Sequence, residues 1–283
     1  MQIELLDTFL DLIATRSFHR TADRLGVTQS TVSGRVQALE TALGARLFTR
    51  SRAGTDLTTE GLKFEPFARS LSREWTESLR AVQSTGASAL NLRLGMQHDL
   101  AASHIGDWVS EFRKTLPDTA FYIELDYSIQ MCLDIARGAL DFGVIFTPRP
   151  TPDLHFETVG ELRYRLISTE TDRRAGLRLE SYISAEYSPA FALLHRQMLP
   201  DFAETPIASG QNAAVAGLLS TLGGSAFVLE ETASQMVDEG RARYVTDVPA
   251  LPQPVYTAVH IRNRPSHVHR RLLAIVRARL GRR

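Results

Sequence analysis

Polar side chains able to hydrogen-bond to nucleic-acid bases gather at the start of one predicted helix. Val32, Val36 and Leu39 recur at helical spacing and mark the buried face of that helix. The outer face is left with short or polar side chains, and the N-terminal half of such a helix is the part that enters a major groove. We therefore predict DNA contacts from Thr28, Gln29, Ser30, Thr31, Ser33 and Arg35.

These side chains are expected to act in different ways. Gln29 can make two hydrogen bonds to adenine, and a threonine methyl group can pack on a thymine methyl group. Ser33 and Arg35 can bind phosphates as readily as they read bases. For Thr28 the alternative to a DNA contact is a purely structural role as the helix cap. Gly34 costs the helix about 0.5 to 1 kcal/mol relative to alanine, so either a backbone approaches closely there or one contact is absent.

Three short helices and a hairpin are predicted to position this face. Leu6, Phe9, Leu10 and Ile13 have helical spacing in the first helix. Ser17 can cap a second helix that ends at Gly26, and Thr28 can cap the third, which ends at Gly44 and buries Leu43 with the other apolar residues. Two short helices joined by a tight turn form a helix-turn-helix. The polar, glycine-containing segment 50–56 lies between Leu47-Phe48 and Leu57-Thr58 and predicts a hairpin, or wing.

The charge of the chain is neutral overall but uneven. Lys and Arg number 32, and so do Asp and Glu. Residues 16–55 nevertheless carry an excess of arginine, which favours contact with phosphates. Within the wing, Arg50 and Arg52 are predicted to reach phosphates or a minor groove; solvated surface arginines are the alternative.

A long helix is predicted over about residues 60–83. Its apolar side chains advance by three or four positions, and a lone helix cannot bury such a stripe by itself. We therefore predict pairing with a second copy of the chain through Phe67, Leu71, Trp75 and Leu79. The predicted domains are a DNA-binding domain at 1–58, a linker and dimerisation helix at 59–88, and a further domain at 89–283.

The last domain alternates strands and helices, which predicts an α/β fold with a mostly parallel sheet. The pattern indicates two lobes. Subdomain I is predicted at about 89–161 and 256–283, and subdomain II at about 162–255. Separate strands are expected near 155–159 and 164–168, and another at 121–127 with one buried face.

Ligands of open α/β sheets bind beyond the carboxyl ends of the strands. Polar residues follow several predicted strands, and these predict a crevice between the lobes lined by Gln97, His98, Ser128, Thr147, Ser209 and Asn212. Asp99 opposes a simple anion site, although His98 could offset its charge. Each of these residues can also serve as an ordinary helix cap or loop residue.

The first sixty residues resemble the LysR-type transcriptional regulators. The resemblance is carried by Phe18, Thr21-Ala22, the run from Leu25 to Ser30, Val32-Ser33, Arg35, Leu39-Glu40, Leu43-Gly44, Leu47-Phe48, Arg50, Leu57-Thr58 and Gly61. It continues more loosely through Leu140-Asp141-Phe142-Gly143-Val144. Pro66 and the segment 182–191 are most similar to the flagellar-operon-repressor-like subgroup.

The resemblance implies a winged helix-turn-helix joined to two Rossmann-like subdomains, similar to periplasmic solute-binding proteins. It implies a small-molecule effector between these subdomains, double-stranded promoter or operator DNA as a partner, and a homodimer or homotetramer. RNA polymerase is a further expected partner if the protein activates transcription.

Other functional classes have less support. The single cysteine, Cys132, excludes an internal disulfide and a thiolate-cluster metal site. No run of ~20 apolar residues is present, and acidic residues interrupt the N-terminus where a signal peptide would be apolar, so we expect a cytoplasmic protein without membrane contact. We find no convincing catalytic, cofactor or metal motif. An effector-independent DNA-binding regulator remains the alternative, with an enzyme or a solute-binding protein as more remote ones.

Overall fold

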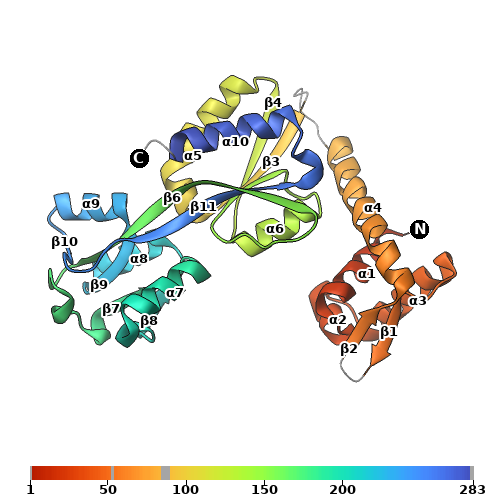
Figure 1. Ribbon diagram of the computed structural model, residues 1–283, viewed down its shortest axis with the longest axis horizontal. Coiled ribbons are helices and arrows are strands. Elements are labelled where there is room, and N and C mark those ends of the chain that lie inside the picture. Colours follow the sequence, from red (N-terminus) through yellow and green to blue (C-terminus); the bar gives the residue numbers. More distant parts are fainter. Residues whose placement is uncertain (1, 52–53, 84–89, 281–283) are drawn as a thin grey trace. The chain divides into compact units, whose positions relative to one another are not determined.

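A computed structural model describes residues 2–51, 54–83 and 90–280 of the chain. The N-terminal part contains the helices α1 (Ile3–Thr15), α2 (Phe18–Leu25) and α3 (Gln29–Leu43). The strands β1 (Phe48–Ser51) and β2 (Gly54–Leu57) form an antiparallel hairpin (Figure 1). The predicted helix-turn-helix and wing are therefore both present.

Local sequence signals begin and end these helices. The Ser17 hydroxyl accepts a hydrogen bond from the Arg20 amide at the start of α2. Gly26 and Gly44 end α2 and α3 with φ of 63° and 65°, a conformation that favours glycine. Phe9 is fully buried at the centre of this core and packs on Phe48 and Phe64 with ring centroids 5.3 Å apart.

The predicted burial of one residue of α3, Leu43, is wrong. Val32, Val36 and Leu39 are buried, but Leu43 is 41% exposed. Leu43 lies in the last turn of the helix, directly before its glycine cap. The helical period places Leu43 on the inner face, but it cannot show where the packing partners of the helix end.

The helix α4 (Thr59–Gln83) runs over 25 residues. Phe64 and Ala68 pack on the core of the N-terminal part, and the Ser72 hydroxyl donates to Asp7 Oδ1 at 2.9 Å. One side of α4 is thus fixed to the helix-turn-helix.

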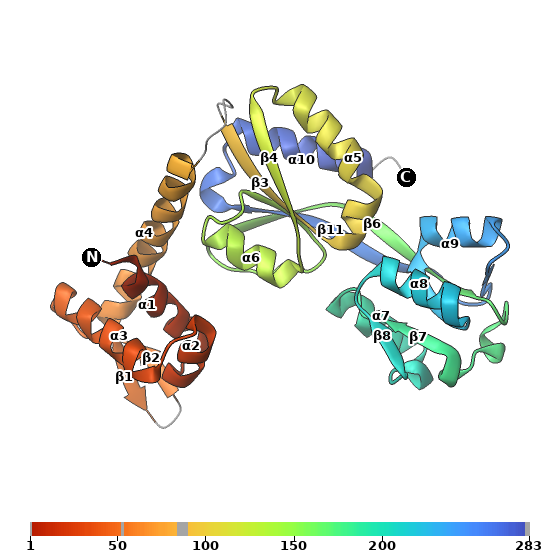
Figure 2. The ribbon, with the colours of Figure 1, turned by 180° about the vertical axis from the view of Figure 1, so that it is seen from behind.

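Over the described residues 90–280, the C-terminal part is built on one mixed sheet of nine strands (Figures 1 and 2). Along the sheet the order is β4, β3, β5, β11, β6, β9, β7, β8, and β10 pairs with β6. The strands are β3 (Leu90–Met96), β4 (Thr119–Leu125), β5 (Phe142–Ile145), β6 (Leu154–Ser168), β7 (Tyr182–Ala185), β8 (Ile207–Ser209), β9 (Ser225–Leu229), β10 (Arg243–Tyr244) and β11 (Leu251–His260).

Two parallel groups of strands define two lobes. The first lobe contains β4, β3 and β5, and the second contains β9, β7 and β8. The strands β6 and β11 pair antiparallel along most of their length and pass through both lobes as crossover strands. Their pairing has a register shift between Val255 and Tyr256.

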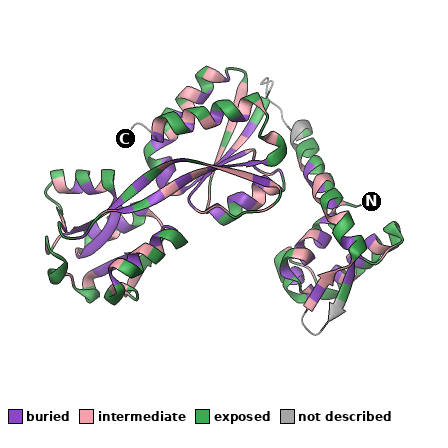
Figure 3. Cartoon of the chain, in the orientation of Figure 1, coloured by how far each residue is buried: buried purple, intermediate pink, exposed green. Residues whose placement is uncertain are grey.

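Helices cover the sheet in both lobes. In the first lobe, α5 (His98–Thr115) and α10 (His267–Leu280) lie side by side on one face, with α6 (Ser128–Ala136) on the other (Figures 1 and 2). The second lobe has α7 (Pro189–Met198), α8 (Asn212–Leu222) and α9 (Glu230–Asp238). The strands form the buried layer, while the helices expose their outer faces (Figure 3).

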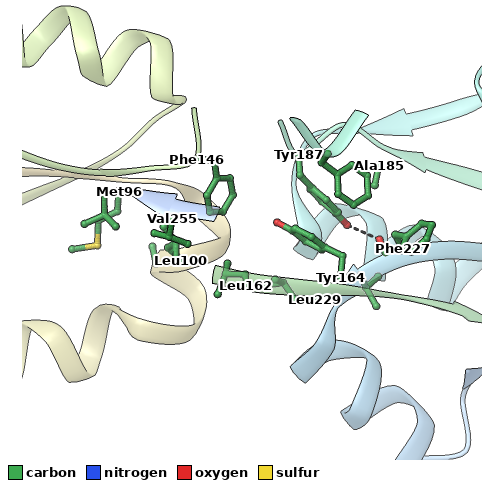
Figure 4. Close-up of a cluster of buried hydrophobic side chains, with 14 of the residues drawn as sticks. Met96, Leu100, Phe146, Leu162, Tyr164, Ala185, Tyr187, Phe227, Leu229 and Val255 are labelled. Carbon is green, nitrogen blue, oxygen red and sulfur yellow. Dashed lines mark hydrogen bonds between the residues drawn. The ribbon is translucent and has the colours of Figure 1, made fainter. Parts of the chain in front are cut away.

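The hydrophobic core is continuous through the two lobes. Side chains from both gather around the crossover strands, among them Phe146 and Leu162 on one side and Tyr164, Tyr187 and Phe227 on the other (Figure 4). The Tyr187 hydroxyl donates to the Phe227 carbonyl at 2.7 Å. None of the helices in the described part of the chain is long and apolar enough to cross a bilayer.

The structure corrects two strand predictions. The strands expected near 155–159 and 164–168 are one continuous strand, β6, so it belongs to both lobes. The strand expected at 121–127 ends at Leu125, and Leu125 and Tyr127 are 42% and 49% exposed. As β4 is the edge strand of the sheet, fewer neighbours cover its end. The helices α7 and α9 and the strands β7 and β10 were not among the predicted elements.

Candidate nucleic-acid interface and ligand cleft

The start of α3 presents a patch of exposed polar side chains. Thr28, Gln29, Ser30 and Thr31 are all exposed. The Thr28 hydroxyl accepts from the Thr31 amide at 3.2 Å and also contacts the hydroxyls of Ser30 and Thr31, at 2.9 and 2.8 Å. Thr28 is therefore a cap in this structure, and Gln29 is an exposed long side chain with no partner among the residues that the structure describes.

Ser33 and Arg35 are half-buried and lie further along α3. Arg35 Nη1 donates to the Thr8 hydroxyl on α1 at 3.3 Å, which ties the recognition helix to α1. At Gly34, an added Cβ would meet no atom of the chain within 4 Å. No segment of this chain among the described residues requires glycine there, so the missing side chain leaves open space on the outer face.

The arginines near the helix-turn-helix fall into two groups. Arg16 pairs with Asp56, and Arg24 pairs with the buried Asp11 at 3.1 Å. Arg20 and Arg46, in contrast, are exposed and have no partner among the described residues. The local charge excess was visible in the sequence, but which arginines were already neutralised depended on contacts between elements.

Two predicted wing contacts cannot be placed. The backbone of Arg50 lies in β1, opposite Thr55, but its side chain lies outside what the structure describes. Arg52 lies outside the described residues altogether.

The predicted dimerisation stripe of α4 is exposed in the single chain. Phe67, Leu71, Trp75 and Leu79 are 66%, 40%, 48% and 41% exposed. A soluble protein rarely leaves a row of large apolar side chains in water, so this stripe is available for a partner.

A cavity of about 440 Å³ lies where the two lobes meet. The first lobe contributes residues from the ends of its strands and from the start of α6, and the second contributes the segment between β7 and α7. The lining residues are Gln97, Tyr127, Ser128, Ile129, Thr147, Glu186, Tyr187, Ser188, Pro189 and Ala192. The cavity thus lies at the carboxyl ends of parallel strands, the usual ligand position in such sheets.

Three of the predicted crevice residues, Gln97, Ser128 and Thr147, line this cavity, and the first two hydrogen-bond to each other. The side-chain amide of Gln97 contacts Ser128 Oγ at 2.7 Å. With its oxygen turned towards α6, that amide also accepts from the Ser128 backbone N–H. Ser128 Oγ accepts from the amides of Phe146 and Thr147 at 3.0 and 3.1 Å. Ser128 therefore joins the end of β5 to the start of α6, while the Thr147 side chain has no hydrogen-bond partner in the described part of the chain.

The other predicted crevice residues lie nearby with different partners. The His98 ring lies 5.8 Å from the Tyr127 ring. Ser209 ends β8, and its carbonyl accepts from the Glu186 amide. The Asn212 side chain accepts from the Leu229 amide at 2.7 Å and donates to Thr232 at 2.9 Å. Asn212 thus fixes the start of α8 to α9.

Asp99 links the lobes. Its carboxylate accepts from the Tyr164 hydroxyl at 2.7 Å and from the Asn212 amide at 2.9 Å. Burial is the largest influence on Asp99 and raises its pKa, opposed by these two hydrogen bonds and by nearby His98. Burial together with the Asp99 charge also raises the pKa of Tyr164. The first amide of α8 is therefore occupied by the chain's own carboxylate.

Sequence reasoning did not find Tyr127 and Glu186 as cavity residues. Tyr127 was assigned to a strand face, and Glu186 lies after β7, which was not predicted. The sequence signal that could have identified Glu186 as a cavity residue is its place between the end of a strand and the helix cap Ser188.

A larger hollow of about 900 Å³ is lined by parts of β6, β9, β11, α5, α9 and α10. It borders mainly the middles of the crossover strands, and Leu229 is the one parallel-strand end among its described lining residues, whereas the smaller cavity lies at the ends of several parallel strands. For this reason the smaller cavity is the better candidate for a ligand site.

The fold and the two sites together define a DNA-binding protein that carries a two-lobed ligand-binding domain. Residues 3–62 match the family described as bacterial regulatory helix-turn-helix proteins of the lysR family. Residues 86–281 match the LysR substrate binding domain. The chain belongs to the LysR family of transcriptional regulators, and the resemblance drawn from the sequence is confirmed.

Individual relatives agree with this assignment. The HTH-type transcriptional regulator HdfR of Yersinia pestis (strain Pestoides F) is 28% identical over 278 residues, covering 93% of this chain and 92% of HdfR. Full-length LysG of Corynebacterium glutamicum with bound effector Arg has a TM-score of 0.56 at 20% identity, covering 99% of this chain and 98% of LysG. ArgP of Mycobacterium tuberculosis has a TM-score of 0.56 at 21% identity, covering 98% of this chain and 96% of ArgP. The protein is a DNA-binding transcriptional regulator with an effector-binding domain.

Proposed function

We propose that the protein acts in the cytoplasm and binds operator DNA through the N-terminal half of α3, with Gln29 reading a base. The exposure of Gln29 beside the Thr28 cap is the observation that carries this assignment. Ser30, Thr31 and Ser33 contribute further contacts on the same face. Arg20, Arg46 and the wing arginines Arg50 and Arg52 supply phosphate contacts that add affinity without sequence preference.

The α4 stripe pairs two chains, and two such dimers form a tetramer on an interrupted dyad. Small molecules bind in the cavity between the lobes and change the arrangement of the DNA-binding dimers. The full-length neighbour LysG with its bound effector supports an effector role for this domain. RNA polymerase is a further partner where the regulator activates transcription.

Substitution of Gln29 tests the DNA-binding assignment. Operator sequences are first selected from fragmented genomic DNA with the purified protein. A lost bidentate contact is worth about 1–3 kcal/mol, so Gln29→Ala should lower the ratio of specific to non-specific affinity by roughly 5- to 150-fold. Gln37→Ala is the matched control, since Gln37 is exposed on the second half of the same helix. Unchanged sequence preference in competition binding would exclude Gln29 as a base reader.

A further inference from the structure

Most hydrogen-bonding groups of the 440 Å³ cavity are already satisfied within the chain. Gln97 and Ser128 bind each other, and the Tyr187 hydroxyl donates to Phe227 O. The Ser188 hydroxyl bonds with the Gln253 amide oxygen at 2.5 Å and accepts from the Phe191 amide. These groups shape the cavity, but they have little hydrogen-bonding capacity left for a ligand.

Three lining side chains have no hydrogen-bond partner among the described residues: those of Tyr127, Thr147 and Glu186. Of these, only Glu186 carries a charge. No lysine, arginine or histidine is found among the described residues that line the cavity. Glu186 is therefore the charged side chain among the described lining residues, while the His98 ring lies 5.8 Å from that of the lining residue Tyr127.

Helix N-termini would ordinarily favour an anion here, but one backbone donor at the start of each of α6, α7 and α8 is bound within the chain. The Ser128 amide at the start of α6 faces the Gln97 oxygen. Helix α7 begins with Pro189, which has no N–H, and its Phe191 amide donates to Ser188. At α8, the first amide donates to Asp99. The chain's own acceptors therefore take one of the donors that each helix start could offer to an anionic ligand.

Tyr127 and Glu186 come from different lobes and meet near Gly210. A Cβ added to Gly210 would lie 3.4 Å from the Tyr127 hydroxyl and 3.3 Å from the Glu186 carbonyl oxygen. That contact involves the backbone of Glu186, but the side chains of Tyr127 and Glu186 both line the same cavity. A cation bound there would face an aromatic ring and a carboxylate, which both attract positive charge. Ile129, Pro189 and Ala192 add apolar wall for the rest of a ligand.

We propose that the effector is a small organic cation whose ammonium or guanidinium group binds Glu186 and Tyr127, with its apolar part against Ile129, Pro189 and Ala192. Such a ligand contacts both lobes, so its binding favours one arrangement of the cleft. This proposal rests on the proposed function, in which the effector binds between the lobes.

Matched ligand pairs test the charge requirement on the full-length protein. Benzylamine is compared with benzyl alcohol and with benzoate, and lysine with norleucine, by thermal shift and titration calorimetry. We expect the cationic member to bind at least about tenfold more tightly than its neutral partner, a difference of about 1.4 kcal/mol. Glu186→Gln should abolish that preference. Glu204→Gln should retain it, since Glu204 is an exposed carboxylate before β8 in the same lobe.

A cavity-filling variant separates this inference from the proposed function. Ala192→Phe should block binding in the cavity, whereas Ala190→Phe on the exposed side of α7 should not. If neutral or anionic compounds bind as well as cations and Ala192→Phe blocks them, effector binding stands and the cation requirement is refuted. Equal preference in Glu186→Gln and the parent protein also refutes it. If no compound of any class gives binding that Ala192→Phe abolishes, both proposals fail.

Discussion

Removing the Asp99 carboxylate should destabilise the effector domain strongly. Asp99 is 5% exposed and lies at the start of α5 in the first lobe. It accepts hydrogen bonds from Tyr164, on a crossover strand, and from Asn212, in the second lobe. Asp99→Ala leaves the buried Tyr164 hydroxyl and the Asn212 amide without their acceptor.

The magnitude follows from these two donors. Each buried group left unsatisfied costs about 1–3 kcal/mol, so Asp99→Ala should cost roughly 2–6 kcal/mol. Desolvation of the carboxylate in the parent protein works against this loss, as shown by its raised pKa, which favours the lower half of that range. At roughly 2–4 °C per kcal/mol for a domain of this size, a loss of about 3 kcal/mol lowers the Tm by roughly 6–12 °C.

Differential scanning calorimetry of the full-length protein measures this shift. Asp118→Ala is the control, since Asp118 is exposed beyond the end of α5, and it should change the Tm by no more than about 2 °C. Asp99→Asn keeps one acceptor oxygen and should fall between the two. If Asp99→Ala lowered the Tm no more than Asp118→Ala does, the hydrogen bonds of Asp99 would not be what joins the lobes.

Two further predictions concern pH and assembly. Burial lowers the pKa of His195, whose Nε2 lies 2.8 Å from the Tyr182 hydroxyl. Its neutral form therefore contributes stability that is present above the unfolded pKa of 6.5 and is lost as the pH falls below it. His195→Gln should reduce the Tm loss between about pH 7.5 and about pH 5.5, while the exposed His19→Gln should not; equal losses in all three proteins would contradict this account. Trp75→Ser should shift the sedimenting species from the assembled form towards the monomer, whereas Trp108→Phe inside the effector domain should not, and an unchanged sedimentation coefficient would exclude α4 as the pairing surface.

The helix-turn-helix was predictable because its signals are local. Caps such as Ser17 and Thr28 act on amides three residues away, and Gly26 and Gly44 end helices through their own backbone conformation. Helical spacing also identified the apolar stripe of α4. The stripe's exposure, with Trp75 at 48%, agrees with the reasoning that a lone helix cannot bury it.

The sequence by itself therefore determined the start and end of the recognition helix, its outward polar face and the α/β character of the second half. Tertiary structure alone decided that β6 crosses both lobes, that Asp99 holds an amide 113 residues away, and that Tyr127 and Glu186 meet at one cavity. The physical reason is the range of the interactions. A cap or a helical period is set by neighbours within one or two turns, whereas strand pairing and the partners of a buried carboxylate depend on which distant segments the folded chain brings together.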